Sequence, residues 1–162
     1  MTDQVDRILE QWQREKPGLD VSPMAVIGRL SRTTLAVDSR LSATFARHGL
    51  DVSSFDVLAT LLRSGTPYRI TPAELAREAM ISTSAVAQRL NKLEARGLVA
   101  REANPNDGRG TLVALTGIGK ELIEKALPDH LETERAILSP LNSEEQAVLA
   151  LLLGRIGDVA GA

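Results

Sequence analysis

The chain has no cysteine, and this absence removes three kinds of chemistry. Disulfide bonds, thiol catalysis and zinc sites built on cysteine are all excluded. Histidine is also scarce, because His48 and His130 are the only two and they lie far apart in the sequence. They lack the spacing of metal ligands, so the sequence predicts no metal site.

Long apolar runs are missing as well, and no stretch reaches the length of a transmembrane helix. The first residues are acidic and amphipathic, unlike a signal peptide. No glycine-rich phosphate loop stands between a strand and a helix, and no nucleophile motif occurs. We therefore expect a cytoplasmic protein that has no catalytic residues, no cofactor and no contact with a membrane.

The net charge of −2 conceals an uneven distribution. Residues 21–119 hold twelve Lys and Arg against eight Asp and Glu, whereas residues 1–20 and 120–162 are net acidic. Attraction to phosphate depends on the local field rather than on the total charge. The middle of the chain is therefore where nucleic-acid binding is expected.

A short helix is predicted to begin in this basic region, at Thr71. Thr71 is a favourable N-cap, Pro72 fits the first helical position, and Glu74 stands where a capping box requires an acid. The pattern ends near residue 80. Thr71 and Glu74 are thus expected to form a capping box at the start of this helix.

A second helix is predicted over residues 84–96, with Ser82 or Thr83 as its cap. Its apolar residues repeat at i, i+4 and i+7, which indicates one buried face. The opposite face carries three hydrogen-bonding residues: Ser84, Gln88 and Asn91. Two helices joined by a tight turn, with a polar outer face on the second, are typical of a helix-turn-helix.

A hairpin is predicted directly after this pair of helices. Residues 98–101 and 111–115 have the composition of strands, and residues 104–110 between them are rich in turn formers. Residues 68–70 form a short extended piece that is expected to pair with the hairpin as a third strand. A helix-turn-helix followed by a hairpin is a winged helix.

The remaining segments are expected to be helical. Helices are predicted over 3–15, 23–47 (capped by Ser22), 53–62 and 116–126. A kink is expected at Pro128, and a last helix is expected to begin with Ser143 as its cap. Residues 147–153 are apolar almost all round, so this last helix must be buried, either between two chains or in an ordinary core.

The expected fold class is mainly α with a small β-wing. Residues 1–22 form an extra N-terminal helix, residues 23–50 and 116–162 form dimerisation helices, and residues 51–115 form the winged helix-turn-helix DNA-binding domain.

Several motifs resemble one protein family. Residues 90–99, the tip Asp107-Gly108-Arg109 and the helix start Leu115-Thr116-Gly117-Ile118-Gly119-Lys120 are similar to the MarR family of bacterial transcription regulators. The resemblance covers roughly residues 23–159. It implies a homodimer that binds pseudo-palindromic duplex DNA, with repression as the expected output. The branch that senses oxidants through a thiol is excluded, because the chain has no cysteine.

This sequence departs from the family pattern in the wing. Asn104 stands where Asp is frequent, and Gly108 stands where a second Arg is common. Both changes lower the charge of the wing, so weaker or more flexible binding by the wing is expected.

The expected DNA contacts follow from side-chain chemistry. Gln and Asn suit adenine edges, whereas Ser and Thr suit phosphate or bases. Arg89 is expected to contact phosphate or to brace its helix, and the resemblance implies that Arg109 enters the minor groove. The full set is Ser82, Thr83, Ser84, Gln88, Arg89, Asn91, Lys92 and Arg109. The alternatives are a solvated helix surface and a module for protein contacts, and the second predicts an apolar outer face.

An effector site is implied by a closer resemblance to the urate-responsive, PecS-like branch of the family. The positions that match are Trp12, Asp56, Arg89 and Arg101, with Glu74 a weaker match. A tryptophan offers a flat surface, an arginine meets an anion, and a carboxylate accepts ring N–H groups. The alternative is structural: Trp12 packs the N-terminal helix onto the core, and Asp56 caps a helix or forms a salt bridge.

Overall fold

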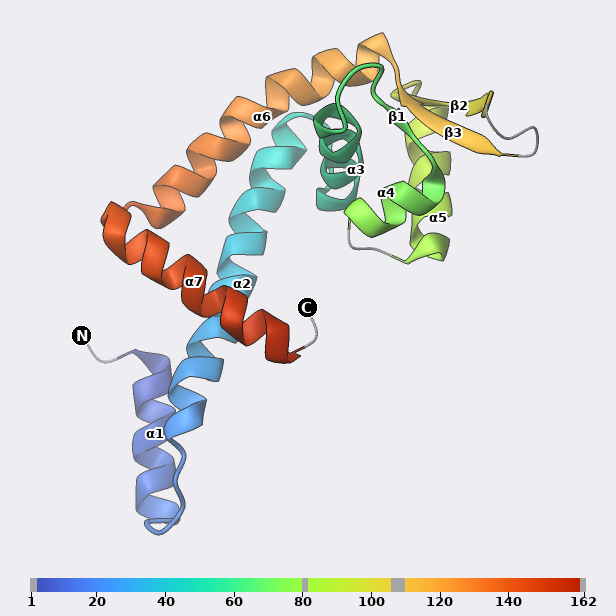
Figure 1. The fold of residues 1–162 in the computed structure, drawn as a ribbon. Helices are drawn as coiled ribbons and strands as arrows, with labels where there is room; N and C mark the ends of the chain where they lie inside the picture. Colours follow the sequence, from blue (N-terminus) through green and yellow to red (C-terminus); the bar gives the residue numbers. More distant parts are fainter. Residues whose placement is uncertain (1–2, 80–81, 106–109, 161–162) are drawn as a thin grey trace. The chain divides into compact units, whose positions relative to one another are not determined.

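The computed structural model describes residues 3–79, 82–105 and 110–160. The chain divides into two compact units, residues 1–40 and 41–162 (Figure 1). The first unit contains α1 (Gln4–Glu15) and most of α2 (Ser22–Arg47). In the second, the last turns of α2 are followed by five helices and a small sheet.

Charged side chains hold the two helices of the first unit together. A capping box between Asp3 and Asp6 begins α1, and the Arg29 guanidinium from α2 binds both carboxylates, with Nε 2.8 Å from Asp3 Oδ2. Val5 is 4% exposed, and a Cβ on Gly28 would lie only 3.3 Å from it. The small residue at position 28 therefore permits the close packing of α1 on α2.

The second unit is a winged helix. Its helices are α3 (Val52–Arg63), α4 (Pro72–Glu78), α5 (Thr83–Ala95), α6 (Gly117–Leu138) and α7 (Ser143–Ala160). Its strands are β1 (Arg69–Ile70), β2 (Val99–Ala103) and β3 (Thr111–Leu115). Figure 1 shows α3, α4 and α5 gathered beside the sheet. The helix pair and the hairpin that follows it confirm the predicted winged helix.

The sheet is antiparallel, with strand order β1-β3-β2. Arg69 pairs with Ala114 on one side of β3, and Val99 pairs with Leu115 on the other. The predicted third strand is therefore confirmed. The core of the unit consists of fully buried side chains from the helices and the sheet: Phe45, Val57, Leu58, Leu61, Leu75, Val86, Leu90, Leu93, Val99, Val113 and Ile123. Among them are the three apolar residues that define the predicted inner face of α5.

Helix α6 extends further than the predicted 116–126 and continues through Pro128, from Gly117 to Leu138, and the kink expected at Pro128 stays a prediction. Proline removes one helical hydrogen bond, but Pro128 lies on the exposed side of α6, where water can bind the released carbonyl. Contacts beyond the proline hold the helix in place. The Thr133 hydroxyl lies 2.7 Å from that of Thr44, and Asp129 Oδ2 lies 2.9 Å from His48 Nε2.

Two predicted caps were also misplaced. Asn142, not Ser143, caps α7: its Oδ1 accepts from the Glu145 N–H at 3.0 Å, and Glu145 Oε2 accepts from the Asn142 N–H at 2.8 Å. Ser22 lies inside the first turn of α2, and the Asp20 carboxylate accepts from its N–H at 2.9 Å. In both places a side chain other than the expected serine accepts a backbone hydrogen bond at the start of the helix: Asn142 stands one residue before Ser143, and Asp20 stands two residues before Ser22.

Asp51 caps α3 and also joins it to α5. Its Oδ1 accepts from the Ser54 N–H at 2.7 Å, and its Oδ2 forms an ion pair with Lys92 Nζ. The hydrogen bond from Lys92, together with that from the Ser54 N–H, lowers the pKa of Asp51 from 3.8 to about 2. The folded state therefore gains stability from the ionised carboxylate above pH 3.8, and this gain is lost as the pH falls towards 2.

We expect Asp51→Ala to lower the free energy of unfolding at neutral pH by about 1 kcal/mol, through loss of the cap. Asp51→Asn is the matched variant, because Asn also caps helices but cannot form the ion pair. Urea unfolding between neutral pH and the acid range should show a smaller loss of stability on acidification for Asp51→Asn than for the wild type. Identical pH profiles for these two proteins would contradict the role of the Asp51 charge.

Candidate nucleic-acid interface

The outer face of α5 is exposed and polar. Ser84, Gln88 and Asn91 lie on it at helical spacing, together with the small Ala87. The Ser82 hydroxyl begins the helix by accepting from the Ala85 N–H at 3.3 Å, and it lies 3.1 Å from the Ser84 hydroxyl. Because Ala87 leaves room between the polar residues, this face can approach another surface closely.

Two of the expected DNA contacts lie outside the described residues. Arg109 and the wing tip around it, including Asp107 and Gly108, are in the segment between residues 105 and 110. Thr83 is the first residue of α5, but its side chain is likewise not among those described. The roles of Thr83 and Arg109 stay predictions.

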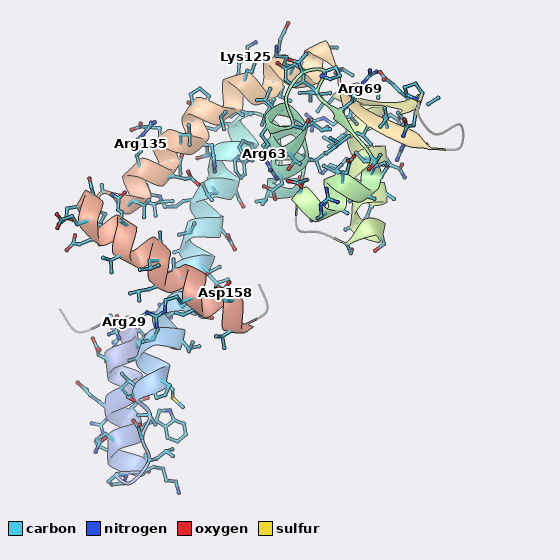
Figure 2. The ribbon with its side chains drawn as sticks, viewed as in Figure 1. Arg29, Arg63, Arg69, Lys125, Arg135 and Asp158 are labelled. Atoms are coloured by element: carbon cyan, nitrogen blue, oxygen red, sulfur yellow. The ribbon has the colours of Figure 1, made fainter. Side chains whose placement is uncertain are left out.

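Helix α4 begins with a capping box and is joined to α3 by an ion pair. Thr71 and Glu74 form the predicted capping box, in which Glu74 Oε2 accepts from the Thr71 N–H and hydroxyl, both at 2.8 Å. These hydrogen bonds lower the pKa of the Glu74 carboxyl. Arg63 at the end of α3 (labelled in Figure 2) lies 3.3 Å from the Glu78 carboxylate at the end of α4. The carboxylate of Glu74 thus has a structural role within α4.

The wing is tied to α5 through Arg101 on β2. The Arg101 guanidinium forms an ion pair with Glu94, and its Nη2 donates to Asn91 Oδ1 at 2.7 Å. The Arg101 backbone N–H also donates to Glu94 Oε1 at 3.2 Å. Arg101 therefore contacts α5, and it holds one of the polar residues of the outer face.

Other basic residues near this face also have acidic partners. Lys92 is paired with Asp51, and Arg69 (Figure 2) reaches across the sheet to Glu102 at 3.3 Å. Such exposed pairs contribute little stability, because water and salt screen them. A phosphate can therefore compete for Lys92 or Arg69 at small cost.

A second polar group lies in the interior, between α3, α5 and α6. Asp56 on α3 is half-buried, and burial raises the pKa of its carboxyl, whereas the charges of Arg89 and His130 act in the opposite direction. Arg89 Nη1 and His130 Nδ1 are both buried, and neither has a hydrogen-bond partner among the described residues. Buried polar atoms normally have partners, so this group can bind a polar molecule.

Aromatic contacts fix the position of His130. Its ring lies 4.7 Å from that of Phe55 and 5.4 Å from that of Phe45, measured between ring centres. Its Nε2 lies 3.2 Å from Glu134 Oε1, one turn further along α6. When this Nε2 carries the proton, Nδ1 is a hydrogen-bond acceptor within the polar group.

The structure thus brings together two of the five residues expected at the effector site, Asp56 and Arg89. Arg101 and Glu74 instead have partners elsewhere in the second unit, and Trp12 belongs to the first unit, where it is 38% exposed on α1. Sequence reasoning missed His130, which is 74 positions from Asp56 and follows no motif. Its only local signal is Glu134, four residues later on the same helix face.

Within the described ranges, no helix combines the length and the apolar character needed to cross a membrane. Over the same part of the chain, His, Asp and Glu residues form no cluster of three or more that suits a metal ion.

Comparison with known proteins identifies the fold and the family. A model of the MarR family matches residues 48–110. The HTH-type transcriptional regulator PecS of Dickeya dadantii (strain 3937) is 42% identical over 153 residues, which cover 94% of this chain and 92% of PecS.

Two solved structures agree with this relationship. Sco3205, a MarR family transcriptional regulator from Streptomyces coelicolor solved in complex with DNA, is 25% identical with a TM-score of 0.79, and the match covers 86% of this chain and 88% of Sco3205. BpsR from Bordetella bronchiseptica, whose DNA binding is regulated by 6-hydroxynicotinic acid, is 26% identical with a TM-score of 0.74, over 82% of this chain and 93% of BpsR. With 42% identity to PecS over nearly the whole of both chains, this protein belongs to the MarR family of transcriptional regulators.

Proposed function

We propose that the protein is a ligand-responsive repressor that binds pseudo-palindromic duplex DNA as a homodimer. Two α5 helices would lie in successive major grooves, about one helical turn apart, and the wings would lie along the flanking minor grooves. Membership of the MarR family supports this proposal, as does the likeness to Sco3205, which was solved in complex with DNA.

The observation that carries the proposal is the outer face of α5. Ser84, Gln88 and Asn91 are exposed there, above a side of the same helix that is fully buried. Hydrogen-bonding side chains of this kind can read base edges, whereas a helix used for protein contacts needs exposed apolar groups. The alternative of a winged helix that only binds proteins is therefore the weaker one.

We further propose that a small anionic aromatic molecule, such as urate, binds at Asp56 and Arg89 and releases the protein from DNA. The unpartnered Arg89 Nη1 supports this, since it offers a buried donor to an anion, and the Asp56 carboxylate can accept ring N–H groups. His130 Nδ1 adds a third polar atom. Because Arg89 is on α5, a ligand there would favour a different position of α5 and so weaken DNA binding.

The test is fluorescence anisotropy with the duplex upstream of the protein's own gene, with and without urate, at two salt concentrations. Tight binding that weakens with salt and with urate is the expected result. Tight DNA binding that is unchanged by urate would exclude urate as the effector, and the proposed role as a DNA-binding regulator would still stand. Absence of specific binding to this duplex and to a randomised library would favour the protein-contact alternative.

Asp56→Asn tests the effector site directly. We expect its DNA affinity without urate to equal that of the wild type, and the urate concentration for half-release to rise at least about ten-fold, as for the loss of a hydrogen bond to a charged group. Glu121→Gln, at an exposed carboxylate on α6, is the control and should respond like the wild type. An unchanged urate response in Asp56→Asn would place the site elsewhere. The same measurement on Trp12→Ala separately tests whether Trp12 belongs to the effector site, as the resemblance implies.

A further inference from the structure

The amide of Asn91 has a fixed orientation, because Arg101 holds it. Arg101 Nη2 lies 2.7 Å from Asn91 Oδ1, and a guanidinium has donors only, so its partner must be the amide oxygen. The guanidinium itself is anchored by its ion pair with Glu94. The amide therefore cannot exchange its oxygen and nitrogen without losing this hydrogen bond.

This orientation restricts which bases Asn91 can contact. The usual contact of an asparagine with adenine uses both ends of the amide, since Oδ1 accepts from the N6 amino group while Nδ2 donates to N7. Here Oδ1 already accepts from a cation, and its remaining lone pair lies beside a positive charge that repels the N6 amino group. The Nδ2 amino group keeps both of its N–H donors.

We infer that Asn91 acts as a hydrogen-bond donor only and selects bases that present acceptors in the major groove, and that Arg101 is the positioning residue that sets this preference. Guanine offers two adjacent acceptors, O6 and N7, and no donor at its major-groove edge, whereas adenine places its N6 amino group beside N7. The inference rests on the proposed DNA binding. It replaces the A·T pair, which an asparagine in isolation would favour, with a G·C pair at this position.

Selection from a library of duplexes with a randomised core, using the full chain, tests the inference. Comparison of the wild type with Asn91→Ala identifies the base pair that Asn91 reads, because only that position loses its preference. In the wild type, a G·C pair there, in either orientation, should exceed an A·T pair by about five- to ten-fold, as expected for one good base contact.

Variants of the network separate positioning from support of the fold. Arg101→Met should raise A·T pairs at that position by about ten-fold relative to G·C pairs, because Asn91 Oδ1 becomes free to accept from adenine N6. Glu94→Gln is the matched control: it removes the charge of the ion pair but leaves Arg101 to hold Asn91, so the preference should persist. Asn91→Asp, which keeps a partner for Arg101 and presents only acceptors to DNA, should lose the preference for a G·C pair, because a carboxylate accepts equally from cytosine N4 and adenine N6.

The outcomes are distinguishable. An A·T pair as the preferred pair in the wild type, or the same preference in Arg101→Met as in the wild type, would overturn the inference. So would a wild-type motif that Asn91→Ala leaves unchanged. If Arg101→Met fails to fold, the result with Asn91→Asp decides alone. A wild type that enriches no motif would instead overturn the proposed DNA binding, and the inference with it.

Discussion

Gly119→Ala is expected to lower the free energy of unfolding by at least about 3 kcal/mol, at the upper end for a single overpacked position. Gly119 is buried in the first turn of α6, where an added Cβ would lie 2.0 Å from the Leu98 carbonyl oxygen and 2.9 Å from its carbon. Both are backbone atoms, so no side-chain rotation can relieve the overlap.

The Leu98 carbonyl is also held in place. It accepts from the Thr116 N–H at 3.2 Å and from the Thr116 hydroxyl at 3.0 Å. Relief of the overlap would therefore separate the start of α6 from the segment that joins α5 to β2, and would break the cap of α6. We expect the loss of stability to be accompanied by a loss of DNA binding, because α5 and the wing share this segment.

Gly117→Ala is the matched control, two residues earlier on the same helix. An added Cβ at Gly117 would meet nothing within 4 Å, and the position is exposed. This variant should be as stable as the wild type or up to about 1 kcal/mol more stable, because alanine is the better helix former. Urea unfolding followed by circular dichroism measures both variants. If the free energy of unfolding of Gly119→Ala is within about 1 kcal/mol of the wild-type value, the start of α6 can separate from the segment that joins α5 to β2 at little cost, which would contradict the prediction.

This glycine illustrates what a sequence motif contains. The pattern Leu-Thr-x-x-Gly-Lys predicted a capped helix start at Thr116, and the structure confirms that Thr116 caps α6, with its hydroxyl accepting from the Gly119 N–H at 3.0 Å. The reason for the glycine lies in a contact with Leu98, 21 positions earlier. Local chemistry therefore predicted the cap but not the close approach.

The same distinction explains the other successes and failures. The buried face of α5 and the three-stranded sheet follow from short-range periodicity, and both were predicted. Beyond Pro128, α6 contacts Thr44 and His48, which are more than 80 residues away along the chain. No local pattern contains that information, so the sequence predicted a kink at the proline but not the contacts made beyond it.

The candidate sites divide in a similar way. The polar face of α5 was predicted because its residues are neighbours on one helix. The interior group was only half predicted, because Asp56, Arg89 and His130 come from three helices that tertiary packing brings together. Arg101 was expected to bind an effector, and its hydrogen bond to Asn91 depends on the register between β2 and α5.

Leu152→Asp is expected to convert the proposed homodimer to a monomer and to weaken operator binding at least about 100-fold. Among the described residues of α7, none is buried, and Val148, Leu151 and Leu152 are 55%, 64% and 45% exposed. Burial of apolar surface lowers the free energy by about 25 cal/mol for each Å² removed from water, so packing against a second chain would stabilise this helix. A carboxylate in that interface has no counter-charge and opposes association.

The loss of DNA affinity follows from the loss of the second subunit. A dimer places two α5 helices on one duplex, and the second contact is effectively intramolecular, which increases affinity by about 10²–10⁴. Sedimentation equilibrium measures the mass, and anisotropy with the same duplex measures the affinity. Val159→Asp adds the same charge to the same helix, but beyond the apolar run, and should remain a dimer.

These two measurements also separate the interface from an ordinary core role of α7. If α7 packed within its own chain, Leu152→Asp would lower the free energy of unfolding but leave the mass at that of the wild type. In the interface, the variant should become a monomer whose second unit still unfolds cooperatively, since the core around Leu58 and Leu90 receives no buried residue from α7. A Leu152→Asp protein that is still a dimer, with normal operator affinity, would therefore require a dimer interface that does not use this face of α7.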